Sequence, residues 1–139
     1  MLIDSSLIID FLRRKDKQGS WFHSLVSGDK PLMVSVITQA ELYAGKSVWE
    51  KKRARDELGL IFSALRILPL SEEIAISAGK IRAVYGVDLI DSIIVATAIS
   101  KSVSLATLNQ KHFKSIVNLK LASIKTSVFP SFRAPTRNL

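Results

Sequence analysis

The chain opens with Met1-Leu2-Ile3-Asp4-Ser5-Ser6-Leu7-Ile8, in which a short apolar segment ends at an aspartate and a second apolar run follows almost at once. Leu2 and Ile3 predict the end of a buried strand, and residues 7–14 predict a helix. A strand that leads directly into a helix is the repeating unit of a parallel sheet. This stretch therefore predicts an α/β fold with an acid at the carboxyl end of the first strand, where open parallel sheets bind ligands.

The rest of the sequence repeats this alternation of strand and helix. Further strands are predicted at 32–36, 67–68 and 103–106, with a last one near 119–121. Helices are predicted at 21–26, 38–44 (closed by Gly45), 48–65, 71–86, 91–101 and 110–115. The 91–101 helix is apolar on nearly every side, which predicts that it is central and buried. We therefore expect a mainly parallel sheet wrapped by helices.

Length and composition fit a single intracellular domain. The chain has 139 residues, and we expect a folded domain over 1–126 and a tail over 127–139 that carries Pro130, Pro135 and two arginines. The absence of cysteine excludes a disulfide framework and thiolate metal sites. No apolar run has the length of a membrane span and no signal peptide is visible, so we expect a cytoplasmic protein without membrane contact.

The charge favours a polyanionic partner. Twenty lysines and arginines stand against 12 acids, which gives a formal net charge of +8, and RNA, DNA or an acidic protein would be attracted to such a surface. The basic groups lie at 13–17, at 51–55 and around Lys111 and Lys114. The predicted phosphate contacts are the basic residues nearest the expected pocket: Arg13, Arg14, Lys111 and Lys114. The 51–55 group is either a solvated helix face or a contact for a partner protein.

Three acids stand inside or beside apolar runs: Asp4, Glu41 and Asp91. A buried carboxylate is costly unless it is paired or bound to a metal. All three, together with Asn109, are placed to reach one edge of the predicted sheet. Ligation by oxygen alone suits Mg²⁺ or Mn²⁺. The predicted supporting polar residues around this site are Ser6, Ser92 and Thr107.

Each acid also has an ordinary structural interpretation. Asp4 and Asp91 both suit the N-cap of the helix that follows them, and Glu41 suits a solvated helix surface. Asp88, one turn before Asp91, is interpreted as a turn or surface acid. Only the joint pattern predicts a metal site. A haloacid-dehalogenase-type phosphatase is excluded, because Ser6 stands where such enzymes need a second aspartate.

Four segments, in order and at family-like spacing, resemble PIN-domain ribonucleases of the VapC toxin type. They are Asp4-Ser5-Ser6-Leu7-Ile8, the segment from Ser35 to Leu42, the segment from Asp91 to Ala98, and the segment from Leu105 to Phe113. The resemblance runs from residue 1 to about residue 121. It implies a three-layer α/β/α fold, with Asp4, Glu41 and Asp91 as ligands of Mg²⁺ or Mn²⁺. It also implies a toxin–antitoxin system, cleavage of structured RNA such as transfer or ribosomal RNA by a metal-activated water, a cognate antitoxin and a homodimer.

The chain departs from the family pattern at two places. The fourth acidic position of many members is Asn109 here, and His112 stands at a position that is often acidic. The amide oxygen of Asn109 can still hold a water, so this residue stays in the predicted catalytic set. His112 is either a phosphate contact or an ordinary surface residue. The departure leaves an alternative function open, namely a PIN-like module that binds RNA or protein without cleaving.

Overall fold

A computed structural model describes residues 1–124, so the predicted tail at 127–139 lies outside the described residues. The sheet has four strands in the order β3-β2-β1-β4, and every pairing is parallel. The strands are β1 (Leu2–Ile3), β2 (Met33–Ser35), β3 (Arg66–Leu68) and β4 (Leu105–Ala106). The chain moves outward from β1 to β3 and then crosses back to place β4 on the other side of β1. The predicted mainly parallel sheet is confirmed.

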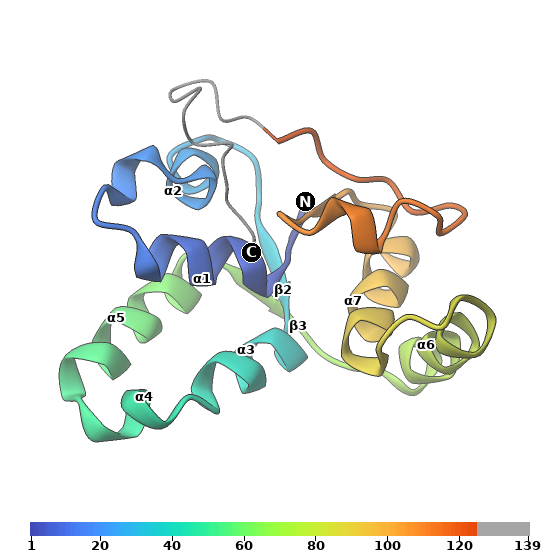
Figure 1. Ribbon diagram of the computed structural model, residues 1–139, viewed down its shortest axis with the longest axis horizontal. Coiled ribbons are helices and arrows are strands. Elements are labelled where there is room, and N and C mark those ends of the chain that lie inside the picture. The colour runs from blue at the N-terminus through green and yellow to red at the C-terminus, as the bar shows by residue number, and fades with distance from the viewer. Residues whose placement is uncertain (125–139) are drawn as a thin grey trace.

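Helices cover both faces of this sheet (Figure 1). They are α1 (Ser5–Arg13), α2 (Trp21–Val26), α3 (Val36–Tyr43), α4 (Lys46–Glu50), α5 (Lys52–Ser63), α6 (Glu72–Tyr85) and α7 (Leu89–Ser100), with 3-10 turns η1 (Lys17–Gly19) and η2 (Gln110–His112). Helices α1, α2 and α5 lie on one side of the strands, and α6 and α7 lie on the other. The three-layer α/β/α architecture is therefore confirmed.

Two apolar cores, one on each face, follow from the alternation of side chains along a strand. Ile3 faces the core that α1, α2 and α5 complete. Its neighbour Leu2 faces the core formed with α7. Seven consecutive residues of α7, from Ser92 to Ala98, are buried, which confirms the prediction of a central helix.

The sequence predicts that no segment spans a membrane. Among residues 1–124, no single helix has the length and apolar composition needed to cross a membrane. Helices α6 and α7 meet that test only when they are taken as a pair, and they are bent by 119° at the break between them.

The single helix predicted at 48–65 is wrong, because the chain forms two helices that break at Lys51. Lys51 has extended backbone, with φ −124° and ψ 116°. The guanidinium of Arg55 donates to the carbonyls of Val48 and Trp49, at 3.2 and 3.0 Å, which satisfies the end of α4. The Trp49 indole donates to the Tyr43 carbonyl at 2.7 Å and folds α4 back against α3. These side-chain bonds join residues six or seven apart, so no helical periodicity signals them.

Other predicted boundaries shift for local reasons. Gly45 is not the C-cap of α3; Ala44 is, and Gly45 is the N-cap of α4. The strand predicted at 103–106 begins only at Leu105, because the Val103 amide donates to the Ala98 carbonyl at the end of α7. The helix predicted at 110–115 is the 3-10 turn η2, and the last strand reduces to one bridge between Leu105 and Leu121.

Helix α6 begins and ends where its sequence predicts. Two of its glycines allow the assignment of its C-terminal end to be tested. Ser71 caps its first turn by accepting from the Ile74 amide at 3.1 Å, and Gly86 ends it in the left-handed conformation at φ +72°. A Cβ would meet no atom within 4 Å either at Gly86 or at Gly79, in the middle of the helix. The two positions therefore differ mainly in backbone conformation.

We expect Gly86→Ala to lower the free energy of unfolding by about 1–2 kcal/mol, because alanine is strained in the left-handed region. Gly79→Ala is the matched control, and it should raise the free energy of unfolding by about 0.5–1 kcal/mol, because alanine is the better helix former. Urea denaturation of both variants measures the difference. Equal effects at the two positions would contradict this account of how α6 ends.

Candidate active site

Asp4 stands at the carboxyl end of β1, and two hydroxyl groups fix its side chain. Its exposed fraction is only 5%. Ser6 Oγ and Thr107 Oγ1 both donate to Asp4 Oδ2, each at 2.8 Å. Although Asp4 occupies the N-cap position of α1, its carboxylate makes no capping hydrogen bond. Within residues 1–124, Oδ1 accepts no hydrogen bond and is not among the fully buried atoms, so this oxygen is left for another partner.

The same two hydroxyls also fix the loop that follows β4. Ser6 Oγ accepts from the Leu108 amide and Thr107 Oγ1 accepts from the Asn109 amide, both at 3.0 Å. The Asn109 carbonyl in turn accepts from the His112 amide at 3.0 Å. Both strand ends are therefore connected through Asp4, and Asn109 and His112 are held close to it. Two predicted supporting residues, Ser6 and Thr107, do contact a predicted site residue.

Glu41 approaches the site from α3, the helix that follows β2. Ser35 caps this helix by accepting from the Ile37 amide at 3.1 Å. Glu41 lies in the last turn of the helix and is exposed to solvent. Partial burial raises the pKa of Glu41, and the negative charges of Asp4, Asp91 and Asp88 raise it further. The like-charge effect shows that the predicted acids lie close together in the folded chain.

Asp91 and Asp88 approach from the start of α7. Asp88 is the N-cap, and its carboxylate accepts from the Ile90 amide at 3.3 Å, so the alternative of Asp91 as the cap is wrong. Burial raises the pKa of Asp91, as do the charges of Asp4 and Asp88, whereas His112 lowers it. Ser92 Oγ donates to the carbonyls of Val87 and Asp88, at 3.1 and 2.9 Å. Ser92 therefore stabilises the turn before α7 and contacts no predicted ligand side chain.

The donor set fits a hydrated divalent cation. None of the four acids forms an ion pair with a lysine or arginine of the described chain, so no lysine or arginine of residues 1–124 is paired with them to offset their mutual repulsion. In residues 1–124, no three acid or histidine side chains close around a single ion position. Mg²⁺ keeps several of its waters in protein sites, so an open set of oxygen donors suits it.

The predicted phosphate contacts lie at different distances from these acids. Lys111 and Lys114 are exposed in and after η2, beside His112, and in the described chain their amines make no hydrogen bond or ion pair. Arg13 ends α1, about 12 Å along the helix from Ser5 at 1.5 Å per residue. Arg14 Nε donates to Asp10 Oδ2 at 3.0 Å. The lysines are therefore the better-placed pair.

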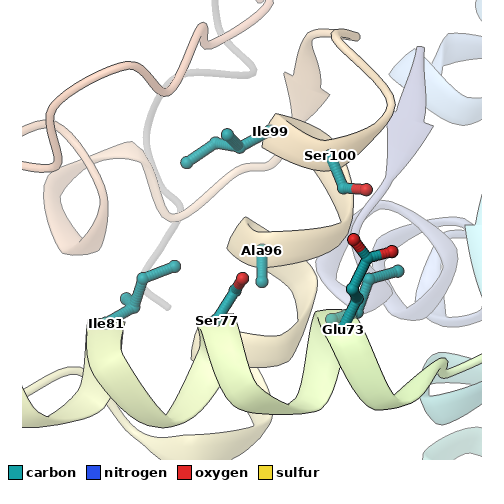
Figure 2. Close-up of a pocket in the computed structure, with 7 residues that line it drawn as sticks. Glu73, Ser77, Ile81, Ala96, Ile99 and Ser100 are labelled. Atoms are coloured by element: carbon teal, nitrogen blue, oxygen red, sulfur yellow. The ribbon is translucent and has the colours of Figure 1, made fainter.

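A hollow lies elsewhere, between α6 and α7 (Figure 2). It has a volume of about 220 Å³, and its lining residues are Glu73, Ile74, Ser77, Ile81, Ala96, Ile99 and Ser100. None of the predicted site residues lines it. It offers one carboxylate, from Glu73, and otherwise hydroxyl and aliphatic groups, so it lacks the acids that phosphodiester chemistry would need.

Two residues, Asp88 and Thr38, have no site role in the sequence prediction. Asp88 is interpreted there as a turn or surface acid, yet its negative charge raises the pKa of both Glu41 and Asp91. Its position one turn before Asp91, at the start of an apolar helix, was the available signal. Thr38 is fully buried, and its hydroxyl is the one buried side-chain oxygen or nitrogen without a partner in residues 1–124. Its place between Ser35 and Glu41 was the only hint in the sequence.

Comparisons with known proteins agree with this geometry. The PIN domain family model matches residues 1–118. Ribonuclease VapC10 of Mycobacterium tuberculosis is 34% identical, with 86% of this chain and 90% of that protein covered. A toxin–antitoxin complex from Klebsiella pneumoniae superposes with a TM-score of 0.64 at 29% identity, over 85% of this chain and 93% of that one. VapBC2 from Rickettsia felis, bound to a promoter DNA fragment, has a TM-score of 0.70 at 21% identity, over 87% and 96%.

Removal of the Thr107 hydroxyl, which joins the ends of β1 and β4, should lower the free energy of unfolding. Thr107→Val removes the hydrogen bond to the Asp4 carboxylate and also the acceptor of the Asn109 amide. We therefore expect a loss of about 2–3 kcal/mol in the free energy of unfolding. Thr97→Val is the control, because Thr97 is equally buried but donates only to the Ile93 carbonyl at 2.7 Å; it should cost about 1 kcal/mol. Chemical denaturation measures both, and equal costs would argue against a special role for Thr107.

The raised pKa values predict how stability depends on pH in the metal-free protein. Glu41 and Asp91 bind protons more tightly in the folded chain than in the unfolded one. Their unfavourable contribution is complete above the raised folded pKa values and disappears as pH falls below the unfolded values, about 4. We therefore expect the Glu41→Gln/Asp91→Asn double variant to exceed the wild type in Tm at pH 7, with the difference shrinking toward pH 4. A constant difference across thermal melts from pH 7 to pH 4 would show that folding does not raise the pKa values of these two acids.

Proposed function

Since this chain belongs to the PIN-domain family, and within it to the VapC ribonucleases, we propose that it is a metal-dependent endoribonuclease and the toxin of a type II toxin–antitoxin module. One observation carries the proposal: a buried aspartate, held by two hydroxyls, lies among acids that form no ion pair with a lysine or arginine of residues 1–124. In a chain of net charge +8, this is an anionic site surrounded by a cationic molecule. Such a combination suits the binding of a cation together with a polyanion.

The proposed ligands of Mg²⁺ or Mn²⁺ are Asp4, Glu41 and Asp91. When bound, such an ion polarises a phosphate oxygen and lowers the pKa of water. Ser6 and Thr107 hold Asp4 in one orientation, so that Oδ1 stays available. Asn109, fixed through its amide by Thr107, stands where many members have a fourth acid, and its side-chain amide can orient a water without adding charge. Asp88 adds to the negative potential that attracts the ion.

The proposed substrate is structured RNA, such as transfer or ribosomal RNA. Lys111 and Lys114 lie beside the acids and would hold the phosphates next to the cleaved bond. Arg13 and Arg14 lie at the far end of α1 and would contact only RNA that extends along this helix. Because these charges bind the backbone, they would position RNA without reading its sequence.

The proposed protein partners are a cognate antitoxin and a second copy of the chain. The Klebsiella pneumoniae neighbour is a toxin–antitoxin complex, and it shares 29% identity with this chain. An antitoxin would hold the nuclease inactive until it is removed. We place this activity in the cytoplasm, where transfer and ribosomal RNA are found.

Asn109 favours a second candidate, a PIN-like module that binds RNA or a partner protein without cleaving. The missing fourth acid lowers the negative charge that draws a second cation to the site. The two functions differ in one measurable respect, since only the nuclease loses an activity when a cation ligand is changed.

Cleavage of total transfer RNA by the purified, antitoxin-free protein tests the proposal. With Mn²⁺ or Mg²⁺ we expect discrete fragments, and with EDTA none. Asp91→Asn should abolish cleavage, a larger loss than the roughly 10–100-fold that follows removal of an outer-shell partner at a metal site. Asp10→Asn, which changes an acid of α1 that is paired with Arg14, is the matched control and should leave cleavage unchanged.

Three outcomes separate the candidates. Metal-dependent cleavage that Asp91→Asn removes would establish the nuclease despite Asn109. RNA binding without cleavage, in a protein that binds no Mn²⁺, would establish the non-cleaving module. Cleavage that persists in EDTA and in Asp91→Asn would overturn the proposed site.

A further inference from the structure

Thr38 carries an unexplained buried hydroxyl. Its exposed fraction is 0%, and among the buried side-chain oxygens and nitrogens of residues 1–124 only Thr38 Oγ1 has no hydrogen-bond partner. Buried polar groups are nearly always satisfied, so an exception requires an explanation. Valine would fill the same volume without an unsatisfied group.

The position of Thr38 in its helix explains why its usual partner is missing. A helical threonine commonly donates to the carbonyl four residues earlier, as Thr97 does to Ile93 at 2.7 Å. Thr38 is only the third residue of α3, so the residue four positions earlier is Val34, which belongs to β2. That carbonyl has the direction of a strand and does not meet the Thr38 hydroxyl. The helix therefore offers this hydroxyl no internal partner.

Strand register places Thr38 beside the carboxylates. Leu2 pairs with Met33 in the parallel ladder, so Asp4 and Ser35, each two residues later, end neighbouring strands. Thr38 is one turn beyond Ser35, in the helix that packs against both α1 and α7. These two helices begin at Asp4 and Asp88. A side chain of α3 that is buried at this point therefore lies near the starts of α1 and α7, the helices that follow Asp4 and Asp88.

Thr38 also shares a helix face with Glu41. Residues three apart project from the same side of a helix, and Glu41 on this side of α3 is one of the three proposed ligands. The face that carries Glu41 is therefore directed toward the other acids. Thr38 lies one turn closer to the sheet on that face, beneath Glu41.

We propose that Thr38 is a positioning residue whose hydroxyl binds a water that enters the site with the divalent cation. This inference rests on the proposed metal dependence. Mg²⁺ keeps several of its waters in protein sites, and the groups that hold such outer partners tune the affinity of the site. Because the acids do not close around a single position, water would complete the coordination of the cation. Thr38 thus supplies a neutral polar contact on the buried side of α3, closer to the sheet than Glu41.

Two measurements on Thr38→Val and Thr38→Ser test the assignment: Mn²⁺ affinity by calorimetry, and the Tm of the metal-free protein. Thr38→Val should bind Mn²⁺ about tenfold more weakly, while its metal-free Tm equals or exceeds that of the wild type, because an unsatisfied hydroxyl has been removed. Thr38→Ser keeps the hydroxyl and should bind like the wild type. Thr97→Val is the matched control, and should lower the Tm without changing the Mn²⁺ affinity.

The outcomes separate this inference from the proposed function. If the wild type and Thr38→Val bind Mn²⁺ equally, the role of Thr38 is overturned while metal dependence stands. If Thr38→Val lowers the metal-free Tm as much as Thr97→Val does, its hydroxyl already has a partner without the cation, which also overturns the inference. If the wild type binds no Mn²⁺ at all, the metal-dependent function and the role of Thr38 both fail.

Discussion

The buried carboxylate of Asp4 is the constraint on which the rest of the site depends. Two hydroxyls, from Ser6 and Thr107, donate to the same oxygen, and each also accepts an amide from the loop after β4. The charge of Asp4 therefore holds together two strand ends that are about a hundred positions apart in the chain. Since hydrogen bonds to a charged group are stronger than neutral ones, this network can fix the loop after β4.

The sheet order explains why the acids meet at that point. Strand β1 lies between β2 and β4, so the segments that follow these three strands leave from one edge. Helix α7 approaches the same edge from the other layer, with Asp88 and Asp91 in its first turns. Burial, together with the repulsion between these acids, raises the pKa values of Glu41 and Asp91, which is a cost to the metal-free fold. A fold that tolerates this cost gains a strong local attraction for cations.

The basic residues divide into those that stabilise the fold and those that remain available to a partner. Lys17 donates to the carbonyls at the end of α1, Arg55 to those at the end of α4, and Arg14 to Asp10. Lys111 and Lys114 are exposed in and after η2, on either side of His112. The net charge of the chain therefore does not say which basic residues can contact RNA, and the location of each residue matters more than the total.

Sequence alone determined the α/β class, the parallel sheet, the central α7 and the family, because short apolar strands, helical stripes and four ordered motifs are local patterns. It also selected Asp4, Glu41 and Asp91, whose apolar surroundings are visible in the chain. Only the tertiary structure decided that Asp88 caps α7 near the other acids, that the helix expected at 48–65 breaks at Lys51, and that Thr38 is buried without a partner. Each of these depends on which groups meet across turns and layers, and on hydrogen bonds that no residue spacing encodes.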